Sequence, residues 1–336
     1  MKFSKYFNLW LYEDDGYYAK APKIGKEGDF YTSVSTSMFF GGTIGKRVVD
    51  LISNKELSTH ATIVEIGAHQ GYMLADLIQF IYTLNPSFLK HLHFSIVEPM
   101  KNLQNIQKKY FKKAFGDEIS FSVVSKIEEL NCDEAVVINN ELLDAFPCEI
   151  IHEEKMLYVK NHISYFDKMS AEVRDISNKL GVKKGEISIG YEEFFNKLKN
   201  SFKNIHFIGF DYGQMESRED FSIRVYKDHQ TYPLFSLTNL AGNSERFEEF
   251  FKKSDLTYDV NFNHVKSAML ESGFKEIEFK SQMSALVDFG INELLDLFRQ
   301  NVDEKVYKNE LEKVKRLILP TYFGERFKMV SSWKRS

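Results

Sequence analysis

The chain of 336 residues is long enough for one large α/β unit with insertions or for two domains. Its content of 43% hydrophobic and 15% aromatic residues excludes global disorder, because such a composition can bury a large core. The 44 basic and 48 acidic residues give a net charge of −4, and neither sign forms a long block. Nucleic acid is therefore not expected as a partner.

The cysteines and the apolar segments indicate in which cellular compartment the protein is expected. Cys132 and Cys148 lack the spacing of a metal site and are too few for a disulfide framework, which favours a reducing compartment. The first ten residues alternate polar and aromatic side chains where a signal peptide needs a continuous apolar stretch. The apolar run at 74–84 is interrupted by polar residues and is shorter than the roughly 20 residues that span a bilayer. We expect a soluble cytoplasmic protein without a metal or an inserted membrane segment, and leave a homodimer open.

The first half of the chain alternates short apolar runs with amphipathic stretches. The run at 62–66 is followed by a glycine-containing turn and by helical spacing over 72–78. A second run at 93–97 precedes a predicted helix at 101–111, and a third run lies at 134–138. Strands that alternate with helices predict an α/β fold with a mostly parallel sheet.

The pattern changes after Pro147. Shorter alternating runs at 148–152 and 156–166 are typical of antiparallel hairpin strands and predict an insertion. A helix at 191–202 and a buried strand at 205–210 then resume the parallel sheet. The polar stretch 213–256 is too long for an idle connection, so we expect an irregular functional loop or lid there.

The last part of the chain is mostly helical in pattern. Helices are predicted at 262–272, 291–299 and 303–318, around a strand at about 274–280, and the run 326–330 is interpreted as an edge strand.

The turn after the first strand is the first candidate for ligand binding. Glu65, Gly67 and Gly71 lie where the strand gives way to a helix. Glycines let a ligand approach the backbone, and the N–H groups of a helix start favour electronegative atoms. With only two glycines, a plain strand-to-helix turn remains the alternative.

An acidic residue ends the next strand. Glu98 is followed directly by Pro99. In a doubly wound sheet, an acid at this place can accept hydrogen bonds from both ribose hydroxyls, and the glycine turn lies beside it. The pair indicates a nucleoside cofactor, with a solvated strand-end glutamate as the alternative.

A third polar group follows the strand at 134–138. Glu141 and Asp144 lie three residues apart and would share one face of a helical turn, where they could bind a cationic substrate. The alternative is structural: Asn140 would cap the helix, and the carboxylates would favour its first turn.

These residues resemble the MidA-type family of S-adenosylmethionine-dependent methyltransferases, which includes arginine methyltransferases that assemble respiratory complex I. The similarity covers nearly the whole chain. The matching blocks are GDFYTS at 28–33, Phe40-Gly41 with Ile44-Gly45, Glu65-Ile66-Gly67 with Gly71, NELLDAFP at 140–147, Asp211-Tyr212-Gly213, Arg224 with His229, Pro233-Leu234, Asp255-Leu256-Thr257 with Val260 and Phe262, and GERFK at 324–328.

The resemblance implies a Rossmann-like class I fold with a seven-stranded sheet and an inserted subdomain on the substrate side. It implies methyl transfer from S-adenosyl-L-methionine to a protein arginine, with a respiratory complex I subunit as one candidate partner. Glu141 and Asp144 would orient and deprotonate the guanidinium. The other implied roles are Asp29 and Thr32 in a lid over the cofactor, Glu65, Gly67, Gly71, Glu98 and Asn140 in cofactor binding, and Asp211 and Tyr212 in the substrate pocket.

The domain organisation follows from these assignments. It comprises an N-terminal lid and helical segment (1–60), the first part of the core (61–147), an inserted hairpin and helix subdomain (148–203), and the second part of the core (204–336).

The chain also departs from the family pattern. His69 stands in a turn that usually reads Gly-Pro-Gly-Arg-Gly, Ser35 replaces a common glutamate, and Asn261 replaces an aspartate. A second hypothesis is therefore a catalytically silent binding or assembly protein that keeps the fold. A nicotinamide-dependent oxidoreductase is a weaker alternative, because the turn lacks the G-x-G-x-x-G spacing.

Overall fold

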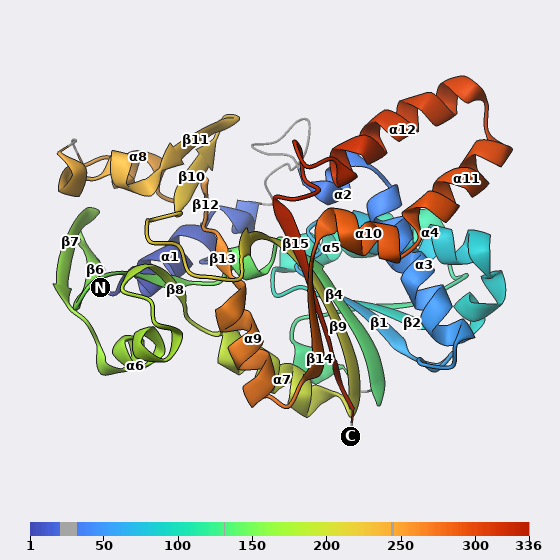
Figure 1. The fold of residues 1–336 in the computed structure, drawn as a ribbon, viewed down its shortest axis with the longest axis horizontal. Helices are drawn as coiled ribbons and strands as arrows, with labels where there is room; N and C mark the ends of the chain where they lie inside the picture. The colour runs from blue at the N-terminus through green and yellow to red at the C-terminus, as the bar shows by residue number, and fades with distance from the viewer. Residues whose placement is uncertain (21–31, 131, 243–244, 336) are drawn as a thin grey trace. The chain divides into compact units, whose positions relative to one another are not determined.

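The computed structural model describes residues 1–20, 32–130, 132–242 and 245–335. The chain divides into two compact units, each built from three separate stretches (Figure 1). The insertion unit comprises Met1–Phe30, Leu143–Phe194 and Gly213–Ala268, and the core unit comprises Tyr31–Leu142, Phe195–Tyr212 and Met269–Ser336. Each of the four predicted segments, 1–60, 61–147, 148–203 and 204–336, is shared between the two units.

The core unit contains the predicted mostly parallel sheet, in which seven strands have the order β14-β15-β9-β4-β1-β2-β3 and a short eighth strand pairs with the end of β9. Six of these seven strands run in the same direction, and β15 is antiparallel to both of its neighbours. The bounds are β1 Thr62–Ile66, β2 His93–Val97, β3 Ser120–Val124, β4 Glu134–Asn140, β9 Asn204–Gln214, β14 Lys275–Ser281 and β15 Phe327–Lys334.

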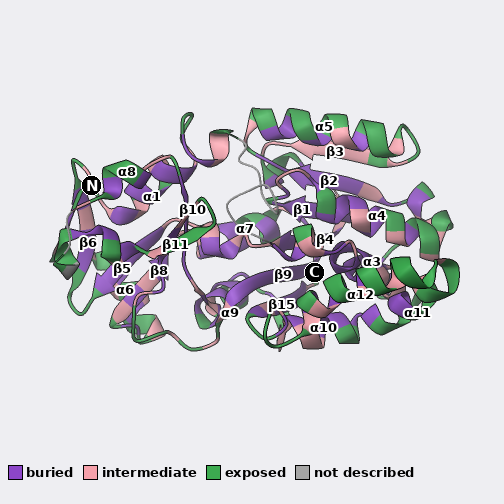
Figure 2. Cartoon of the chain, turned by 90° about the horizontal axis from the view of Figure 1, so that it is seen from above, coloured by how far each residue is buried: buried purple, intermediate pink, exposed green. Residues whose placement is uncertain are grey.

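The strands at the centre of the sheet are buried on both faces. All five residues of β1 are buried, as expected for a parallel strand that reads as a continuous apolar run (Figure 2). Parallel pairing aligns Val64 of β1 with Val137 of β4, and Val137 with Phe207 of β9. The carboxyl ends of β1, β2 and β4 therefore lie along one edge of the sheet.

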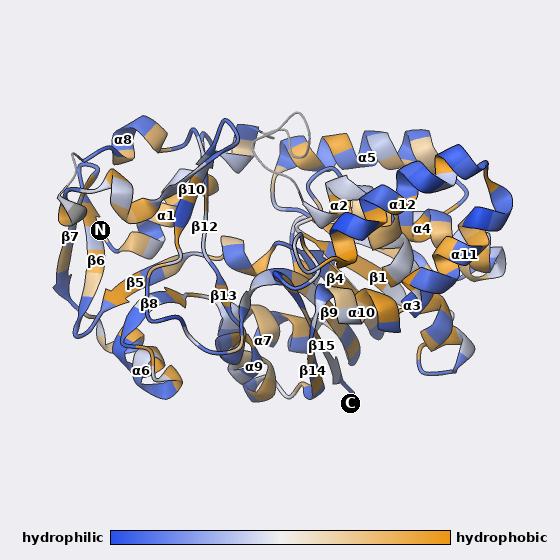
Figure 3. Ribbon diagram, turned by 45° about the horizontal axis from the view of Figure 1, so that its top comes forward, coloured by the Kyte–Doolittle hydropathy of each residue, from blue (hydrophilic) through white to orange (hydrophobic). Residues whose placement is uncertain are grey.

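Helices of the core unit pack on one face of this sheet. Alternate strand residues such as Ile63, Val136 and Ile208 share a hydrophobic cluster with residues of these helices. Along α5, hydrophobic and hydrophilic residues alternate with the helical turn (Figure 3). The helices are α2 Ser33–Thr36, α3 Phe39–Ser53, α4 Tyr72–Leu84, α5 Lys101–Phe115, α10 Gln282–Asp288, α11 Ile291–Asn301 and α12 Glu304–Ile318. No helix in the described part of the chain is both long and apolar enough to cross a bilayer.

The insertion unit is built on two small antiparallel sheets. Its N-terminal helix α1 buries Phe3, Phe7 and Trp10, and the Trp10 indole donates to the Ser254 carbonyl at 2.9 Å. The first sheet has the order β7-β6-β5-β8 and the second β11-β10-β12. The bounds are α1 Phe3–Leu11, β5 Cys148–His152, β6 Lys155–Lys160, β7 Ile163–Lys168, α6 Ala171–Leu180, β8 Lys184–Ser188, β10 Arg224–Lys227, β11 Gln230–Pro233, α8 Phe247–Phe250 and β12 Asp255–Thr257.

Two helices, α7 and α9, and a short strand, β13, lie near the points where the chain passes from one unit to the other. Helix α7 (Tyr191–Ser201) precedes β9, and α9 (Phe262–Glu271) precedes β14. Strand β13 (Val260–Asn261) pairs with the last two residues of β9. Within the core unit, the Phe195 ring of α7 lies 5.3 Å from that of Phe207, on the sheet face opposite Ile208.

The prediction of an irregular lid over 213–256 was wrong. This stretch contains the sheet β11-β10-β12 and helix α8, and it buries apolar residues such as Val225 and Leu256. Its strands are only three or four residues long, too short to show an alternating pattern in the sequence.

The interpretation of 326–330 as an edge strand was also wrong. Strand β15 is hydrogen-bonded on both sides, to β9 and to β14, and β14 forms the edge of the sheet. Ser331 and Ser332 end the apolar run in the sequence, but both are buried in the second half of this strand.

Candidate functional site

The two glycines of the turn after β1, Gly67 and Gly71, have different environments. Gly67 has φ +75° and is exposed, so its backbone is open to a ligand. Gly71 has φ +85° and is buried, and a Cβ atom there would lie 2.7 Å from the Phe111 ring. Glycine at 71 is therefore required by the close packing of α5 against the turn, while Gly67 keeps the predicted binding role.

His69 also adopts a left-handed backbone, with φ +47°. This conformation favours glycine and is uncommon for a residue with a Cβ atom. Its carbonyl oxygen accepts a hydrogen bond from the Gln107 side-chain amide at 2.8 Å. The turn thus keeps the backbone shape of a glycine-rich turn although the side chain is that of histidine.

Glu65 lies below the turn rather than at its surface. It is buried, and its Oε2 accepts from the Leu74 backbone N–H at 3.1 Å. Burial raises the pKa of Glu65 to about 8, against the opposing effect of that hydrogen bond. This contact ties β1 to the start of α4.

Glu98 follows β2, as predicted, at the carboxyl edge of the sheet. Its Oε1 accepts from the Met100 backbone N–H at 3.0 Å, and its Oε2 accepts from the Gln107 amide at 3.3 Å. Burial raises the pKa of Glu98 to about 7, although both hydrogen bonds act in the other direction. Because only these two donors among the described residues contact it, the Glu98 carboxylate can still accept hydrogen bonds from a ligand.

Two buried glutamines of α5 were missed by the sequence analysis. Gln104 donates to the Glu98 carbonyl at 2.6 Å and to Ser125 Oγ at 3.0 Å, while Gln107 contacts both the turn and the Glu98 carboxylate. The signal was present in the sequence: both glutamines lie at helical spacing with Leu103 on the inward face of α5.

The end of β4 brings several polar side chains to the same edge. Asn140 is the last residue of this strand, and its amide donates to Glu141 Oε1 at 2.9 Å. Asn139 is fully buried, and neither of its side-chain polar atoms has a hydrogen-bond partner among the described residues. Buried polar atoms without a hydrogen-bond partner are rare in proteins, and a ligand or a water molecule often supplies the partner.

Glu141 does not lie in a helix, so the predicted helical turn that would place it beside Asp144 was wrong. Glu141 has φ +53°, and its backbone N–H donates to the Phe210 carbonyl of β9 at 2.9 Å. A left-handed glutamate stores backbone strain, which clusters at functional sites. Only Leu143–Ala145 form a short 3₁₀ turn.

Asp144 belongs to the insertion unit, whereas Glu141 belongs to the core unit. Asp144 is buried, and its Oδ2 accepts from the Thr257 hydroxyl at 2.6 Å. Around it, the Tyr12 hydroxyl donates to the Ala145 carbonyl and the Tyr191 hydroxyl to the Leu143 carbonyl. The Thr257 hydroxyl thus holds the Asp144 carboxylate within the insertion unit, and the catalytic role of Asp144 stays a prediction.

The remaining predicted site residues are Asp29 and Thr32, which were assigned to a lid, and Asp211 and Tyr212 of β9. Asp29 lies outside the described residues, whereas Thr32 is buried and caps α2 by accepting from the Ser35 N–H at 3.1 Å. Asp211 is fully buried, and its Oδ1 accepts from the backbone N–H of Tyr212 at 2.9 Å. Both residues extend β9 beyond its pairing with β4, which ends at Asn140.

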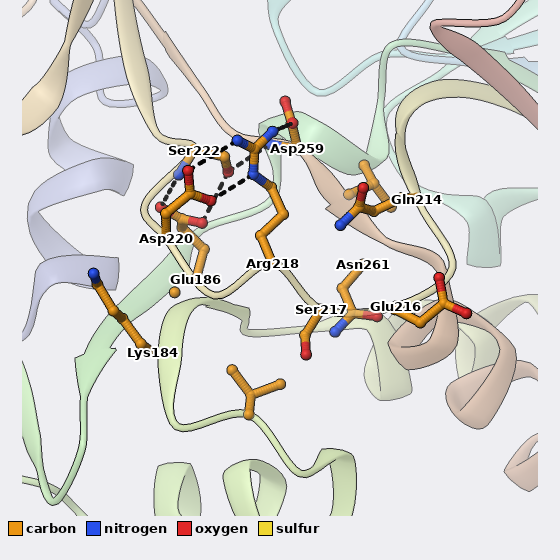
Figure 4. A pocket seen from close by; sticks show the side chains of 13 residues that line it. Lys184, Glu186, Gln214, Glu216, Ser217, Arg218, Asp220, Ser222, Asp259 and Asn261 are labelled. Carbon is orange, nitrogen blue, oxygen red and sulfur yellow. Dashed lines mark hydrogen bonds and ion pairs between the residues drawn. The ribbon is translucent and has the colours of Figure 1, made fainter.

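A polar pocket lies in the insertion unit (Figure 4). Arg218 bridges two carboxylates there, at 2.7 Å to Asp220 and 2.8 Å to Asp259. Glu186 accepts from the backbone and hydroxyl of Ser222. Three charged groups of this pocket, Arg218, Asp220 and Asp259, thus pair with one another, and Glu186 is held by Ser222.

Comparison with known proteins identifies the family. A family model described as "Putative S-adenosyl-L-methionine-dependent methyltransferase" matches residues 43–280, well over half of the chain. The chain belongs to this methyltransferase family. The matched region contains β1, Glu98 and the end of β4, where the candidate cofactor site lies.

Two curated relatives are similar to this chain in sequence, and a solved structure shares its fold. The methyltransferase is 25% identical over 293 residues to the mitochondrial protein arginine methyltransferase NDUFAF7 homolog of Caenorhabditis elegans, covering 75% of this chain and 64% of that protein. It is 21% identical to the Danio rerio NDUFAF7, covering 94% of this chain and 79% of that protein. A Burkholderia thailandensis protein bound to S-adenosyl-homocysteine has the same fold, with a TM-score of 0.79 at 20% identity, covering 100% of this chain and 88% of that one.

The residues of the core unit fit S-adenosylmethionine as the cofactor of this methyltransferase. Gly67 offers an exposed backbone without a Cβ atom, and Glu98 offers acceptors for ribose hydroxyls beside it. Gln107 Oε1 is a buried acceptor without a partner among the described residues. This donor and acceptor set suits a nucleoside with an amino-acid tail.

Proposed function

We propose that this methyltransferase transfers a methyl group to an arginine guanidinium of a protein. The observation that carries the proposal is the end of β4, where Glu141, held in a left-handed conformation, directly follows the strand at the carboxyl edge of the sheet. The names of the curated relatives support arginine as the acceptor.

The cofactor would be held by the glycine turn and by Glu98. The exposed backbone of Gly67 would lie against its amino-acid part, and the Glu98 carboxylate would accept from its ribose hydroxyls. Bound S-adenosylmethionine supplies an electrophilic methyl group on a sulfonium sulfur.

Glu141 would act on the acceptor. A protonated guanidinium has no lone pair for attack, so its nitrogen must lose a proton as the new N–C bond forms and the S–C bond breaks, with the bonding pair returning to sulfur. The Glu141 carboxylate would orient the guanidinium and accept this proton, as a general base. Asn140, which donates to Glu141 Oε1, would fix the direction of the carboxylate.

The test is a methyl-transfer assay with mass spectrometry on an arginine-containing complex I subunit, comparing the wild type with Glu141→Gln. Loss of the base should lower turnover by about 10²-fold or more, the usual range for general-base catalysis. Calorimetry with S-adenosylhomocysteine should give the same affinity for both proteins. Equal turnover in the two proteins would refute the role of Glu141.

A catalytically silent assembly protein is the second candidate. The observation that favours it is His69, which carries a side chain at a left-handed position of the cofactor turn. Cofactor binding without methylation of any arginine, in wild type and variant alike, would support this candidate. In either case we propose a cytoplasmic location and a respiratory complex I subunit as the partner to test first.

A further inference from the structure

Gln107 joins the two parts of the candidate cofactor site. It is fully buried on the inward face of α5. Its side-chain nitrogen donates to the His69 carbonyl at 2.8 Å and, through a longer bond of 3.3 Å, to Glu98 Oε2. One amide group therefore contacts the glycine turn and the ribose-binding carboxylate together.

Packing alone does not account for this glutamine. Gln107 Oε1 is buried and has no hydrogen-bond partner among the described residues, which is unfavourable for folding. An apolar side chain of similar length would fill the same space without that penalty. The amide is therefore explained by what its nitrogen holds.

The neighbouring glutamine holds a different part of Glu98. Gln104 donates to the Glu98 carbonyl and to Ser125 Oγ, so it fixes the backbone after β2. The carboxylate itself is held only by the Met100 N–H and by Gln107, among the described residues. The direction of Oε2 thus depends on Gln107.

We propose that Gln107 is a positioning residue, which holds the Glu98 carboxylate and the His69 turn in the single arrangement that binds the cofactor. The inference rests on the cofactor site described above but not on the identity of the methyl acceptor. Without Gln107, Glu98 Oε2 would lose its one donor among the described residues, and the His69 carbonyl would lose the side-chain amide that donates to it.

A double-mutant cycle tests this role by calorimetry with S-adenosylhomocysteine. Gln107→Met keeps the length of the side chain and removes the donor, and we expect it to weaken binding about tenfold, the scale of a lost hydrogen bond to a charged group. In a Glu98→Ala background, the same substitution should weaken binding less, because only its effect on the His69 turn remains. Such non-additivity shows that Gln107 acts through Glu98.

Two controls separate positioning from stability. Gln79→Met makes the same change at an exposed position of α4, and Val314→Ala removes buried apolar volume from α12. Both should leave the affinity unchanged, the second while lowering the melting temperature. If Gln107→Met does not fold, Gln107→Leu provides a second apolar replacement.

Each outcome is decisive for the inference. Unchanged affinity in Gln107→Met, or fold-changes that multiply in the double variant, would overturn it, because Gln107 would then act independently of Glu98. Normal cofactor binding and coupling without arginine methylation would instead refute the proposed function and leave the positioning role intact. A wild type that does not bind S-adenosylhomocysteine would overturn both.

Discussion

The carboxyl edge of the central sheet and the polar pocket of the insertion unit each contain a glutamate whose pKa is raised by burial to about 7. In the pocket, Glu186 accepts three hydrogen bonds, from the Ser222 and Ile223 N–H groups and the Ser222 hydroxyl. At the sheet edge, Glu98 accepts two, one of them long. Nearby in the same unit, the polar atoms of Asn139 have no described partners.

The difference separates structural polar groups from those that serve a ligand. A buried carboxylate that the fold supplies with donors stabilises the fold, because breaking its contacts leaves those donors unpaired. A buried polar group that the fold leaves incompletely bonded contributes little to stability and can gain bonds from a ligand. We therefore expect the two glutamates to respond in opposite ways to the same substitution.

The largest expected effect comes from replacing either Glu98 or Glu186 with alanine. Glu98→Ala should weaken S-adenosylhomocysteine binding by about 1–3 kcal/mol, because the ribose hydroxyls lose their acceptors, and should change the melting temperature little. Glu186→Ala should lower the free energy of unfolding by a similar amount, about 1–3 kcal/mol, and leave the affinity unchanged. Calorimetry and thermal melts of both variants measure the two effects, and a loss of affinity in Glu186→Ala alone would reverse the comparison.

Asn139 gives a second way to sharpen the comparison. Asn139→Leu keeps the size of the side chain and removes two buried polar atoms that lack described partners. We expect the free energy of unfolding to rise by up to about 1–3 kcal/mol, the penalty for burying unpaired polar groups. Chemical denaturation measures the change. A less stable variant would mean that bound water already satisfies this side chain in the absence of substrate.

The raised pKa values predict opposite trends of stability and binding with pH. Glu98 and Glu186 both have pKa values raised from 4.5 to about 7, so the folded state holds their protons more tightly than the unfolded state. The stabilisation linked to these bound protons is present below about pH 4.5 and is lost as the pH rises through 7, so the two alanine variants are compared above pH 7.

Cofactor affinity should rise over the same range, because the ribose hydroxyls need the ionised form of Glu98. Below its pKa, affinity should fall roughly tenfold for each pH unit. Calorimetry at pH 6 and pH 8 tests this, with Glu98→Ala as the control whose affinity should lose most of the dependence. A pH-independent affinity in the wild type would remove Glu98 from the ribose site.

Much of the fold could be predicted from the sequence, because its central strands are continuous apolar runs. Strand β1 has the predicted bounds, and β2 and the start of β4 were also placed correctly. Strand β3, Ser120–Val124, was missed, since it contains two serines and none of its residues is fully buried. The second half of β15 was missed for a related reason: its serines are buried between two strands, which only the tertiary structure reveals.

Site residues that lie at the ends of parallel strands could be predicted from the sequence. Site residues whose position depends on an unusual backbone conformation could not. Glu98 and Asn140 lie at the expected edge because parallel strands bring their carboxyl ends together. The separation of Glu141 from the turn that contains Asp144 depends on a left-handed backbone, which no local pattern indicates for glutamate. Gln107 was missed although it lies on the apolar face of α5 with Leu103 and Phe111, because the sequence analysis did not examine polar residues on that face.

The smallest expected effect concerns His69 and asks whether its side chain limits cofactor binding. His69 has φ +47°, a conformation that glycine adopts without a steric penalty. His69→Gly should therefore relieve strain in the turn and open its backbone to the cofactor, tightening S-adenosylhomocysteine binding by about two- to fivefold, or less than 1 kcal/mol. The free energy of unfolding should change little, because glycine also increases the entropy of the unfolded chain.

Lys55→Gly is the matched control, since Lys55 has φ +62° at an exposed position in the turn after α3. It should show the same small effect on stability and no effect on affinity. Weaker binding in His69→Gly would instead make the imidazole a direct contact of the cofactor, and the turn would then belong with the side-chain contacts of Glu98 rather than with the open backbone of Gly67.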